Sequence, residues 1–307
     1  MSKTESISPL DNGAMPKKAA GKSVTYFLML VPAVLCILIT SVVPLLGMVG
    51  ISFVNWDLAS TIPPKFNGLD NYVSMFKDAR FLNSMKVQLI LSFFILIAQL
   101  LLGLTAAIAL NGASGKFKWA RGIVMAPFMI PAVVVALIWL TLFTPTVSPI
   151  NSVLEAIGLP GPGWLSSPAL SIFSIVIADT WNNMPFVILI LLASLQSIPH
   201  DLYEAAEVDG ATKWRALLHI TLPALKPALI LVGLIRLIES LKSFPLIYVM
   251  TGGGPGVSTE VTNFYAFVQG FQYSKIGYAS ALALFLFLFT VVISFVTIYL
   301  DRNAEEA

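Results

Sequence analysis

The chain has 307 residues, of which 57% are apolar and only 11% are charged. A soluble domain of this length does not need so much apolar surface, so the composition indicates a polytopic membrane protein. The formal net charge of +2 is too small to indicate a nucleic-acid-binding protein. The single cysteine has no second thiol to pair with, and the sequence contains no cysteine and histidine cluster that would indicate a metal site.

Six segments are predicted to cross a membrane, taking about 20 apolar residues as the length that spans the hydrocarbon core. They are residues 26–53, 87–110, 123–143, 170–195, 228–250 and 279–300. Because backbone amides cannot stay unpaired in lipid, and the segments are too long for barrel strands, we expect α-helices. The predicted fold class is therefore an all-α polytopic membrane protein with six transmembrane helices, forming one domain over residues 26–300.

The distribution of Lys and Arg predicts the orientation, because cytoplasmic loops carry an excess of both. With the N-terminus inside, cytoplasmic segments hold eleven of the eighteen basic residues and outer segments hold five, with Arg236 and Lys242 inside the fifth predicted span. Both termini are therefore expected in the cytoplasm. Residues 1–25 are predicted to be a disordered cytoplasmic tail, and residues 301–307 a cytoplasmic C-terminus.

The polar segment 199–223 separates the fourth and fifth predicted spans and, by the same count, faces the cytoplasm. We expect Pro199 to end the preceding helix, and Asp201 with Glu204 to form the N-cap and capping-box partner of a short helix. Gly210 tolerates left-handed backbone, so one helix is expected to end at Asp209 and another to begin by Thr212. Such a bent pair of helices can enter a partner's groove; a solvated connector is the alternative.

The segment contains Glu-Ala-Ala from Glu204, three further residues, Gly210, nine residues and then Ile-Thr-Leu-Pro ending at Pro223. This spacing resembles the EAA loop of ABC importer permeases. The resemblance extends from about residue 68 onward, and residues 121–143, 150–159, 179–211, 251–271 and 276–284 look like carbohydrate ABC permeases. Within that family they are most similar to the branch typified by the larger membrane subunit of the maltose permease.

The resemblance implies a type I permease fold in the plasma (inner) membrane of a bacterium or archaeon. It implies three partners: a second permease subunit in a heterodimer, a cytoplasmic ATPase dimer that carries ATP and Mg, and an extracytoplasmic solute-binding protein. No cofactor is expected on this chain. The residues implied in coupling to the ATPase are Tyr203, Glu204, Ala205, Ala206, Asp209 and Gly210.

Charged residues inside the fifth predicted span indicate a polar pathway. Arg236, Glu239 and Lys242 would each cost about 2.5 to 3.5 kcal/mol if they faced lipid unpaired, so they must line a cavity or pair. Arg236 and Glu239 are spaced i, i+3, so a pairing between them is one way to neutralise both charges. At 100° per residue, Ser240 and Ser243 share their stripe.

The fourth predicted span carries a second polar face, formed by Asp179, Asn182, Asn183 and Phe186. Amide groups beside an aromatic ring suit a sugar, which presents both hydroxyls and a flat apolar face. The resemblance also places Asn183, Phe186, Arg236, Ser240 and Ser243 at positions that contact sugar in the family. The predicted substrate pathway is therefore Asn182, Asn183, Phe186, Arg236, Glu239, Ser240, Lys242 and Ser243.

Two questions stay open at this point. Arg236, Glu239 and Lys242 can instead tie the subunit to its partner permease across the heterodimer interface. The cargo is a neutral sugar or polyol, or else a sugar derivative whose anionic group is held by Arg236 and Lys242.

An ion-coupled secondary transporter is the alternative function, since it too would have six helices and intramembrane charges. It would not need the EAA spacing. An enzyme is not expected, because no paired-histidine, GxSxG or GxxxxGK[ST] motif occurs; the glycine run at 252–256 is predicted to be a turn. The chain is therefore expected to be a non-catalytic subunit driven by ATP hydrolysis elsewhere.

Overall fold

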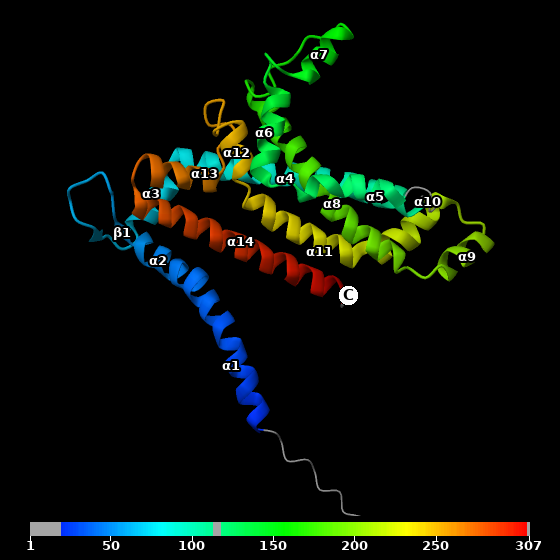
Figure 1. Ribbon diagram of the computed structural model, residues 1–307, viewed down its shortest axis with the longest axis horizontal. Helices are drawn as coiled ribbons and strands as arrows, with labels where there is room; N and C mark the ends of the chain where they lie inside the picture. Colours follow the sequence, from blue (N-terminus) through cyan, green and yellow to red (C-terminus); the bar gives the residue numbers. More distant parts are fainter. Residues whose placement is uncertain (1–19, 113–117, 306–307) are drawn as a thin grey trace, which may run out of the picture. The chain divides into compact units, whose positions relative to one another are not determined.

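The computed structural model describes residues 20–112 and 118–305 (Figure 1). The chain divides into two units, Met1–Met48 and Val49–Ala307, which are described separately. Most of the predicted tail at residues 1–25 lies outside the described residues, but helix already begins at Ala20. In the predicted C-terminal segment 301–307, the last helix continues to Glu305.

The first unit contains helix α1, Ala20–Ile37, and the π-helical turn η1, Leu38–Val42. Helix α2, Val43–Ser52, follows without a break and extends past the unit boundary at residue 48. Residues Met29–Ser52 form one helical stretch that is long and apolar enough to cross a membrane. Its large aliphatic side chains are exposed, as expected for a helix whose surroundings are lipid or a partner.

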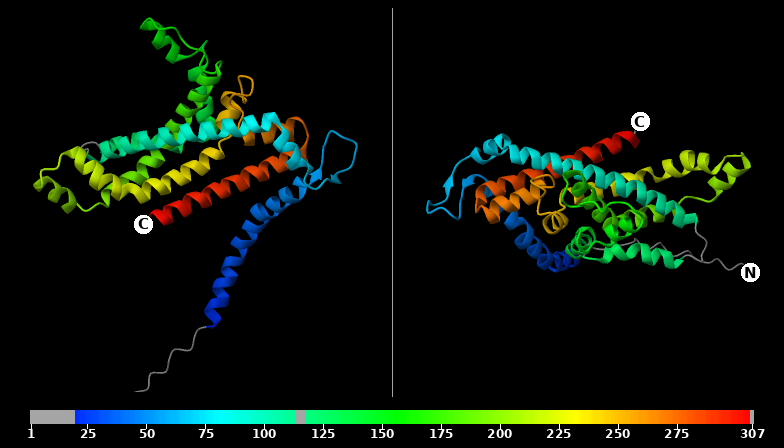
Figure 2. Two further views of the ribbon diagram at one scale, coloured as in Figure 1. Left: turned by 180° about the vertical axis from the view of Figure 1, so that it is seen from behind. Right: turned by 90° about the horizontal axis from the view of Figure 1, so that it is seen from above.

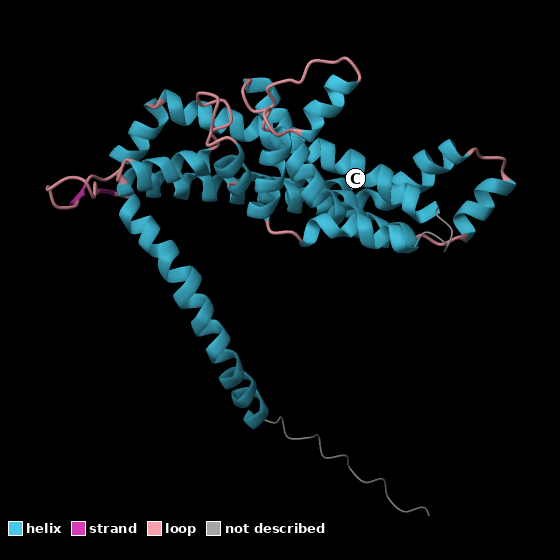
Figure 3. Ribbon diagram, turned by 45° about the horizontal axis from the view of Figure 1, so that its top comes forward, coloured by secondary structure: helices cyan, strands magenta, loops and turns pink. Residues whose placement is uncertain are grey.

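The second unit is almost entirely helical (Figure 3). Its first half contains β1, Val54–Asn55; β2, Lys65–Phe66; α3, Asp70–Lys77; α4, Ala79–Gly112; α5, Lys118–Met125; the 3-10 turn η3, Ala126–Met129; α6, Ala132–Phe143; and α7, Pro149–Ala156. Its second half contains α8, Pro168–Gln196; α9, Asp201–Val208; α10, Lys213–Ala216; the π-helical turn η4, Leu217–Thr221; α11, Leu222–Leu241; α12, Pro245–Met250; α13, Thr262–Phe267; the π-helical turn η5, Val268–Gln272; and α14, Ile276–Glu305. The strands β1 and β2 form an antiparallel hairpin with Val54 opposite Phe66.

The long helices α4, α8 and α11 pack against one another, and α14 lies along α11 (Figures 1 and 2). Helices α4 and α8 approach each other closely at Gly103, where an added Cβ would lie 2.6 Å from Val187 Cγ1. Val187, Ile188 and Leu191 are fully buried beneath α4. Small residues permit such close helix contact in membranes, so Gly103 sets the distance between the two central helices.

In the described residues, five helical stretches are long and apolar enough to cross a membrane, and one bent pair makes a sixth. The predicted continuous span 123–143 is wrong in shape, because Gly122–Met129 and Ala132–Phe143 meet at an angle of 103°. Pro131 explains the bend: it has no N–H to donate to the carbonyl of Pro127 and cannot continue the helix.

The predicted span 228–250 is also two helices rather than one. The membrane-length stretch runs over Lys213–Leu241, and a short break separates it from α12. Pro245, the first residue of α12, removes the amide that would continue the ladder of α11. Lys242 and Ser243 therefore lie in a break between helices and not on a helical face.

The β1–β2 hairpin and α9 lie at opposite ends of the second unit (Figures 1 and 2). At the hairpin end, Arg80 makes a two-pronged ion pair with buried Glu260, with Arg80 Nε 2.8 Å from Glu260 Oε1. Asp78 accepts hydrogen bonds from the hydroxyls of Tyr265 and Tyr278. These bonds tie the start of α4 to α13 and α14, and so make this end a fixed framework.

Candidate substrate pathway and coupling loop

A polar hollow of about 160 Å³ lies where the two helix breaks meet α8 and α11. Six of the eight predicted pathway residues line it, and Asp179 joins them. The lining residues are Ala132, Asp179, Asn182, Asn183, Arg236, Glu239, Lys242, Ser243, Pro245 and Leu246. Ala132 and Pro245 are the first residues of α6 and α12, so both broken helices begin at the hollow. Discontinuous helices are a common source of substrate sites in membrane transporters.

A closed network of buried polar groups borders the hollow through Arg236 and Asp179. Arg236 Nε donates to Gln99 Oε1 at 2.7 Å, and Arg236 Nη2 lies 3.4 Å from Asp179 Oδ1. Gln99 Nε2 donates to the same Asp179 oxygen at 2.8 Å. All three residues are at most 5% exposed. The network joins α4, α8 and α11, and it satisfies charges that apolar surroundings would otherwise make costly.

Arg236 does not pair with Glu239 in the structure. Glu239 instead accepts a hydrogen bond from Lys242 Nζ at 2.9 Å, and both of these side chains are more than half exposed. The i, i+3 spacing allowed either pairing, but Arg236 points between α4 and α8, where Gln99 and Asp179 offer a buried site. The hollow therefore has a buried ion pair and a solvent-accessible one.

Asparagine side chains satisfy the backbone at both helix breaks. Asn182 Nδ2 donates to the carbonyl of Pro127 at 2.7 Å, and Ile130 N donates to the same carbonyl at 3.1 Å. Asn263 Nδ2 donates to the carbonyls of Lys242 and Ser243 at 3.1 and 3.0 Å. Broken backbone inside a membrane needs such partners, so Asn182 holds the shape of the site with its amide nitrogen.

Asn183 lines the hollow, with its Nδ2 donating to Asp179 Oδ1 at 3.1 Å. Two predicted pathway residues lie elsewhere. Phe186 stacks on Phe128 with 5.7 Å between the ring centroids, in the core beside α4. Ser240 is buried against α4: its Oγ donates to the carbonyl of Leu237, and its own carbonyl accepts from Gln88 Nε2.

Gln99 and Asn263 support the hollow but are not among the residues that the sequence predicted. Gln99 is a single amide within an otherwise apolar run of α4, and that isolation is itself a signal of an internal polar partner. Asn263 lies outside every predicted span, and only the unexpected break before α12 reveals its role. No pattern in the sequence pointed to that break except Pro245.

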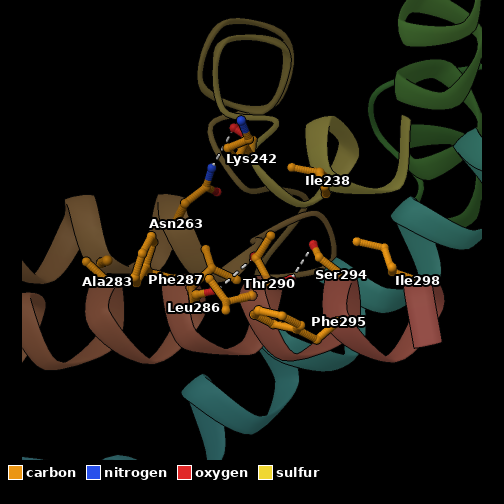
Figure 4. Close-up of a pocket in the computed structure, with 12 residues that line it drawn as sticks. Ile238, Lys242, Asn263, Ala283, Leu286, Phe287, Thr290, Ser294, Phe295 and Ile298 are labelled. Carbon is orange, nitrogen blue, oxygen red and sulfur yellow. Dashed lines mark hydrogen bonds between the residues drawn. The ribbon is translucent and has the colours of Figure 1, made fainter. Parts of the chain in front are cut away.

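An apolar groove of about 620 Å³ runs beside the polar hollow, and Lys242 lines both (Figure 4). Figure 4 shows Phe287, Thr290, Ser294 and Phe295 on the α14 side and Ile238 on the α11 side. The hydroxyls of Thr290 and Ser294 donate to carbonyls one turn back in α14, so they add little polarity to the groove.

The loop at 199–223 has the predicted helix, bend and helix. Gly210 adopts φ +74°, and two hydrogen bonds close the end of α9: Gly210 N to the carbonyl of Glu207 at 3.0 Å, and Ala211 N to that of Ala206 at 2.8 Å. This is a Schellman ending, which favours glycine at its left-handed position. Thr212 then caps α10, its Oγ1 accepting from Arg215 N at 3.3 Å.

The predicted capping box is wrong, because His200 and not Asp201 precedes the first turn and its side chain makes no capping bond. Asp201 and Glu204 lie in the first turn instead, where a negative charge interacts favourably with the helix dipole. Within Asp201–Val208 no side chain is buried, and Val208 is 88% exposed. The hydroxyl of Tyr203 connects this helix to η4, lying 3.0 Å from Thr221 Oγ1.

A hollow of about 380 Å³ lies between α9 and the following helix. The residues that line it are Ala206, Asp209, Ala211, Arg215, Ala216, His219 and Ile220. Of the predicted coupling residues, Ala206 and Asp209 face this hollow, while Glu204, Ala205 and Gly210 are exposed. The loop thus presents a folded, unburied surface of the kind that partner proteins bind.

Known proteins resemble the chain over nearly its whole length. The trehalose/maltose transport system permease protein MalF of Thermococcus litoralis is 35% identical over 95% of this chain and 97% of its own length. The sulfoquinovosyl glycerol transport system permease protein SmoG of Agrobacterium fabrum is 33% identical over 91% of this chain and 90% of its own.

Among solved structures, one chain of a bacterial alginate ABC transporter, in complex with an alginate pentasaccharide-bound periplasmic protein, superposes with a TM-score of 0.82. It shares 27% identity and covers 94% of this chain and 97% of that one. This similarity confirms the predicted type I ABC permease fold. Residues 99–306 also match the family described as binding-protein-dependent transport system inner membrane component. The chain therefore belongs to the family of inner-membrane permease components of binding-protein-dependent ABC transport systems.

Proposed function

We propose that this chain is the transmembrane permease subunit of an ABC importer that moves a sugar, polyol or sugar derivative from a solute-binding protein into the cytoplasm. The observation that carries the proposal is the polar hollow at Asp179 and Arg236, which two broken helices border inside an apolar bundle. Relatives named for trehalose/maltose and sulfoquinovosyl glycerol transport support the substrate class. The chain itself is then non-catalytic, and a separate subunit hydrolyses ATP.

The charges of the hollow favour a neutral cargo. Its two carboxylates are each matched by a basic group, Asp179 by Arg236 and Glu239 by Lys242. Ser243 and Asn183 add a hydroxyl and an amide, which suit sugar hydroxyls. At about 160 Å³ the hollow is smaller than usual ligand pockets, which measure roughly 300 to 1,000 Å³, so another subunit has to complete it.

An anionic cargo is the second candidate, and the exposed pair favours it. Relatives named for sulfoquinovosyl glycerol and for alginate carry negatively charged compounds. Lys242 keeps 57% of its side chain exposed, so its ammonium can reach an anion if Glu239 releases it. Arg236 is a weaker candidate, since Gln99 and Asp179 already engage its guanidinium.

The remaining wall is proposed to come from a second, different permease subunit. The apolar groove that shares Lys242 with the hollow presents the exposed rings of Phe287 and Phe295 to that subunit (Figure 4). A heterodimer packed there would place the hollow on the interface between subunits. Glu239 and Lys242 can then contact both substrate and partner.

The energy is proposed to enter through α9 and its Gly210 bend, docked in a groove of the ATPase. Exposed acidic and apolar groups on α9, including Glu204, Leu202 and Val208, supply the contact surface. This requires the loop to lie in the cytoplasm, as the charge distribution predicts, with both chain termini on the same side.

The test is uptake into proteoliposomes that hold this chain, its partner permease and the ATPase, with the binding protein added outside. We expect uptake of a sugar or sugar derivative that requires both ATP inside and the binding protein, and none with a hydrolysis-deficient ATPase. Uptake by this chain driven by a proton or sodium gradient, with no ATPase present, would establish the ion-coupled carrier instead.

A further inference from the structure

The hairpin end of the second unit contains a strongly polar hollow of about 560 Å³. It lies at the opposite end of this unit from α9, and the charge distribution predicts that it faces outside (Figure 1). The residues that line it are Asn55, Trp56, Asp57, Asn67, Asp70, Asn71, Ser74, Asp78, Tyr265, Gln269, Lys275 and Tyr278. It shares no residue with the substrate hollow.

The hollow is negatively charged. Asp57, Asp70 and Asp78 contribute three carboxylates, and among its described lining residues Lys275 alone is basic. Burial opposes ionisation of Asp78, but hydrogen bonds from Tyr265, Tyr278 and the backbone outweigh it and hold its pKa below the ordinary value. The carboxylate of Asp78 therefore stays ionised at neutral pH, and the hollow attracts positive charge.

Two buried acceptors at the hollow have no donor among the described residues. Gln269 is 7% exposed; its Nε2 donates to the hydroxyl of Tyr265 at 2.7 Å, while its Oε1 has no partner. Asn67 Oδ1 is likewise unpartnered, although its Nδ2 donates to Asn71 Oδ1. Buried acceptors are nearly always hydrogen-bonded, so a ligand donor that reaches either oxygen as the hollow opens would be favoured.

The framework around the hollow is rigid. Gly277 lies so close to the hairpin that an added Cβ would be 2.0 Å from the carbonyl of Val54. Asn71 Nδ2 donates to the carbonyls of Ser52 and Val54 at 2.8 and 3.1 Å. The acceptors are therefore held in place before a ligand arrives, which lowers the ordering cost of binding.

We propose that this hollow receives a basic side chain, Lys or Arg, of the extracytoplasmic solute-binding protein. A cationic group with several N–H donors meets both requirements, excess negative charge and acceptors without donors. A neutral sugar would satisfy the acceptors but not the charge. The inference rests on the proposed importer function, and it assigns the binding protein a contact separate from the substrate hollow.

The test measures the affinity of the binding protein for the complete transporter in nanodiscs, at low and at high salt. Asp57→Asn with Asp70→Asn keeps shape and hydrogen-bonding capacity but removes two charges. We expect the double variant to bind about tenfold or more weakly at low salt, and to lose most of the salt dependence of wild type. ATPase activity without binding protein should stay at the wild-type level, which shows that the variant is assembled.

Lys275→Gln is the matched control, because it removes a charge of opposite sign from the same hollow. We expect it to leave binding unchanged or make it tighter. Unaltered affinity in the double variant, or an equal loss in Lys275→Gln, would overturn the inference. A wild-type complex whose uptake does not depend on a binding protein would instead contradict the proposed function.

Discussion

The polar hollow at Asp179 and Arg236 and the loop at 199–223 both contain many polar residues, but these residues serve opposite purposes. At the hollow, Arg236, Gln99 and Asp179 satisfy one another and are almost fully buried. At the loop, Glu204 and Val208 are exposed, and the conformation is held by backbone bonds around Gly210. Charges in the first region fix helix positions, whereas those in the second are free for another protein.

The largest expected effect is on stability at the hollow. Arg236→Ala would leave the carboxylate of Asp179 buried without its cation, and such losses cost about 3 to 5 kcal/mol. We expect a strongly lowered melting temperature of the purified chain or complex, together with reduced uptake. Fluorescence-monitored thermal unfolding in micelles measures the first, and proteoliposome uptake the second.

The double variant Arg236→Gln with Asp179→Asn is the control for that experiment. It removes both charges but keeps hydrogen-bonding groups, so we expect it to recover much of the stability lost in Arg236→Ala. A melting temperature of Arg236→Ala equal to that of wild type would show that the buried ion pair does not hold α8 and α11 in place. Unchanged uptake would further remove Arg236 from the pathway.

At the loop, we expect a large functional effect with little loss of membrane-domain stability. Gly210→Val meets no neighbouring atom, but a β-branched residue at φ +74° is strained by about 1 to 2 kcal/mol or more. The bend should change, and with it the docking of the ATPase. The expected result is loss of substrate-stimulated ATP hydrolysis and of uptake, with the membrane subunits still assembled.

Gly122→Val is the matched control for the loop variant. Gly122 also has open space around its missing side chain, but its backbone is helical and without positive φ. We expect Gly122→Val to retain coupled hydrolysis. Coupling retained in Gly210→Val would refute the role of the bend.

The sequence predicted the loop better than the hollow, for a physical reason. The loop depends on local signals: a glycine for left-handed backbone and a threonine for the following N-cap. The hollow depends on contacts between distant helices. Periodicity placed Arg236 and Asp179 on polar faces, but it could not show that Gln99 would join them from α4.

The helix breaks also depend on contacts between distant residues, which the sequence does not reveal. Hydropathy is continuous through residues 123–143, so the 103° bend at Pro131 was not predicted. A proline in a membrane helix can be tolerated when another group satisfies the freed carbonyl, and here Ile130 N and Asn182 Nδ2 both donate to the carbonyl of Pro127. The residue predicted to bind substrate thus supports the backbone, which only tertiary structure reveals.

The smallest expected effect on stability concerns the exposed pair at the hollow. Lys242→Gln breaks a pair in which both side chains are more than half exposed, and such pairs contribute only about 0 to 1 kcal/mol. Melting should therefore stay close to that of wild type, in contrast to Arg236→Ala. Uptake kinetics then report on the cargo without interference from unfolding.

Lys242→Gln distinguishes the two candidate cargoes by its effect on transport. For a neutral sugar, the KM of uptake should change little, because Gln still donates a hydrogen bond. For an anionic derivative, losing a charge-assisted contact worth about 1.5 to 3 kcal/mol should raise KM by roughly ten- to a hundredfold. Glu239→Gln should lower the KM for an anionic cargo, because it removes the carboxylate that pairs with Lys242. A fall in melting temperature as large as that of Arg236→Ala would show that Lys242 is structural. The exposed Glu239–Lys242 pair would then stabilise the fold as much as the buried network does, contrary to the distinction drawn between them.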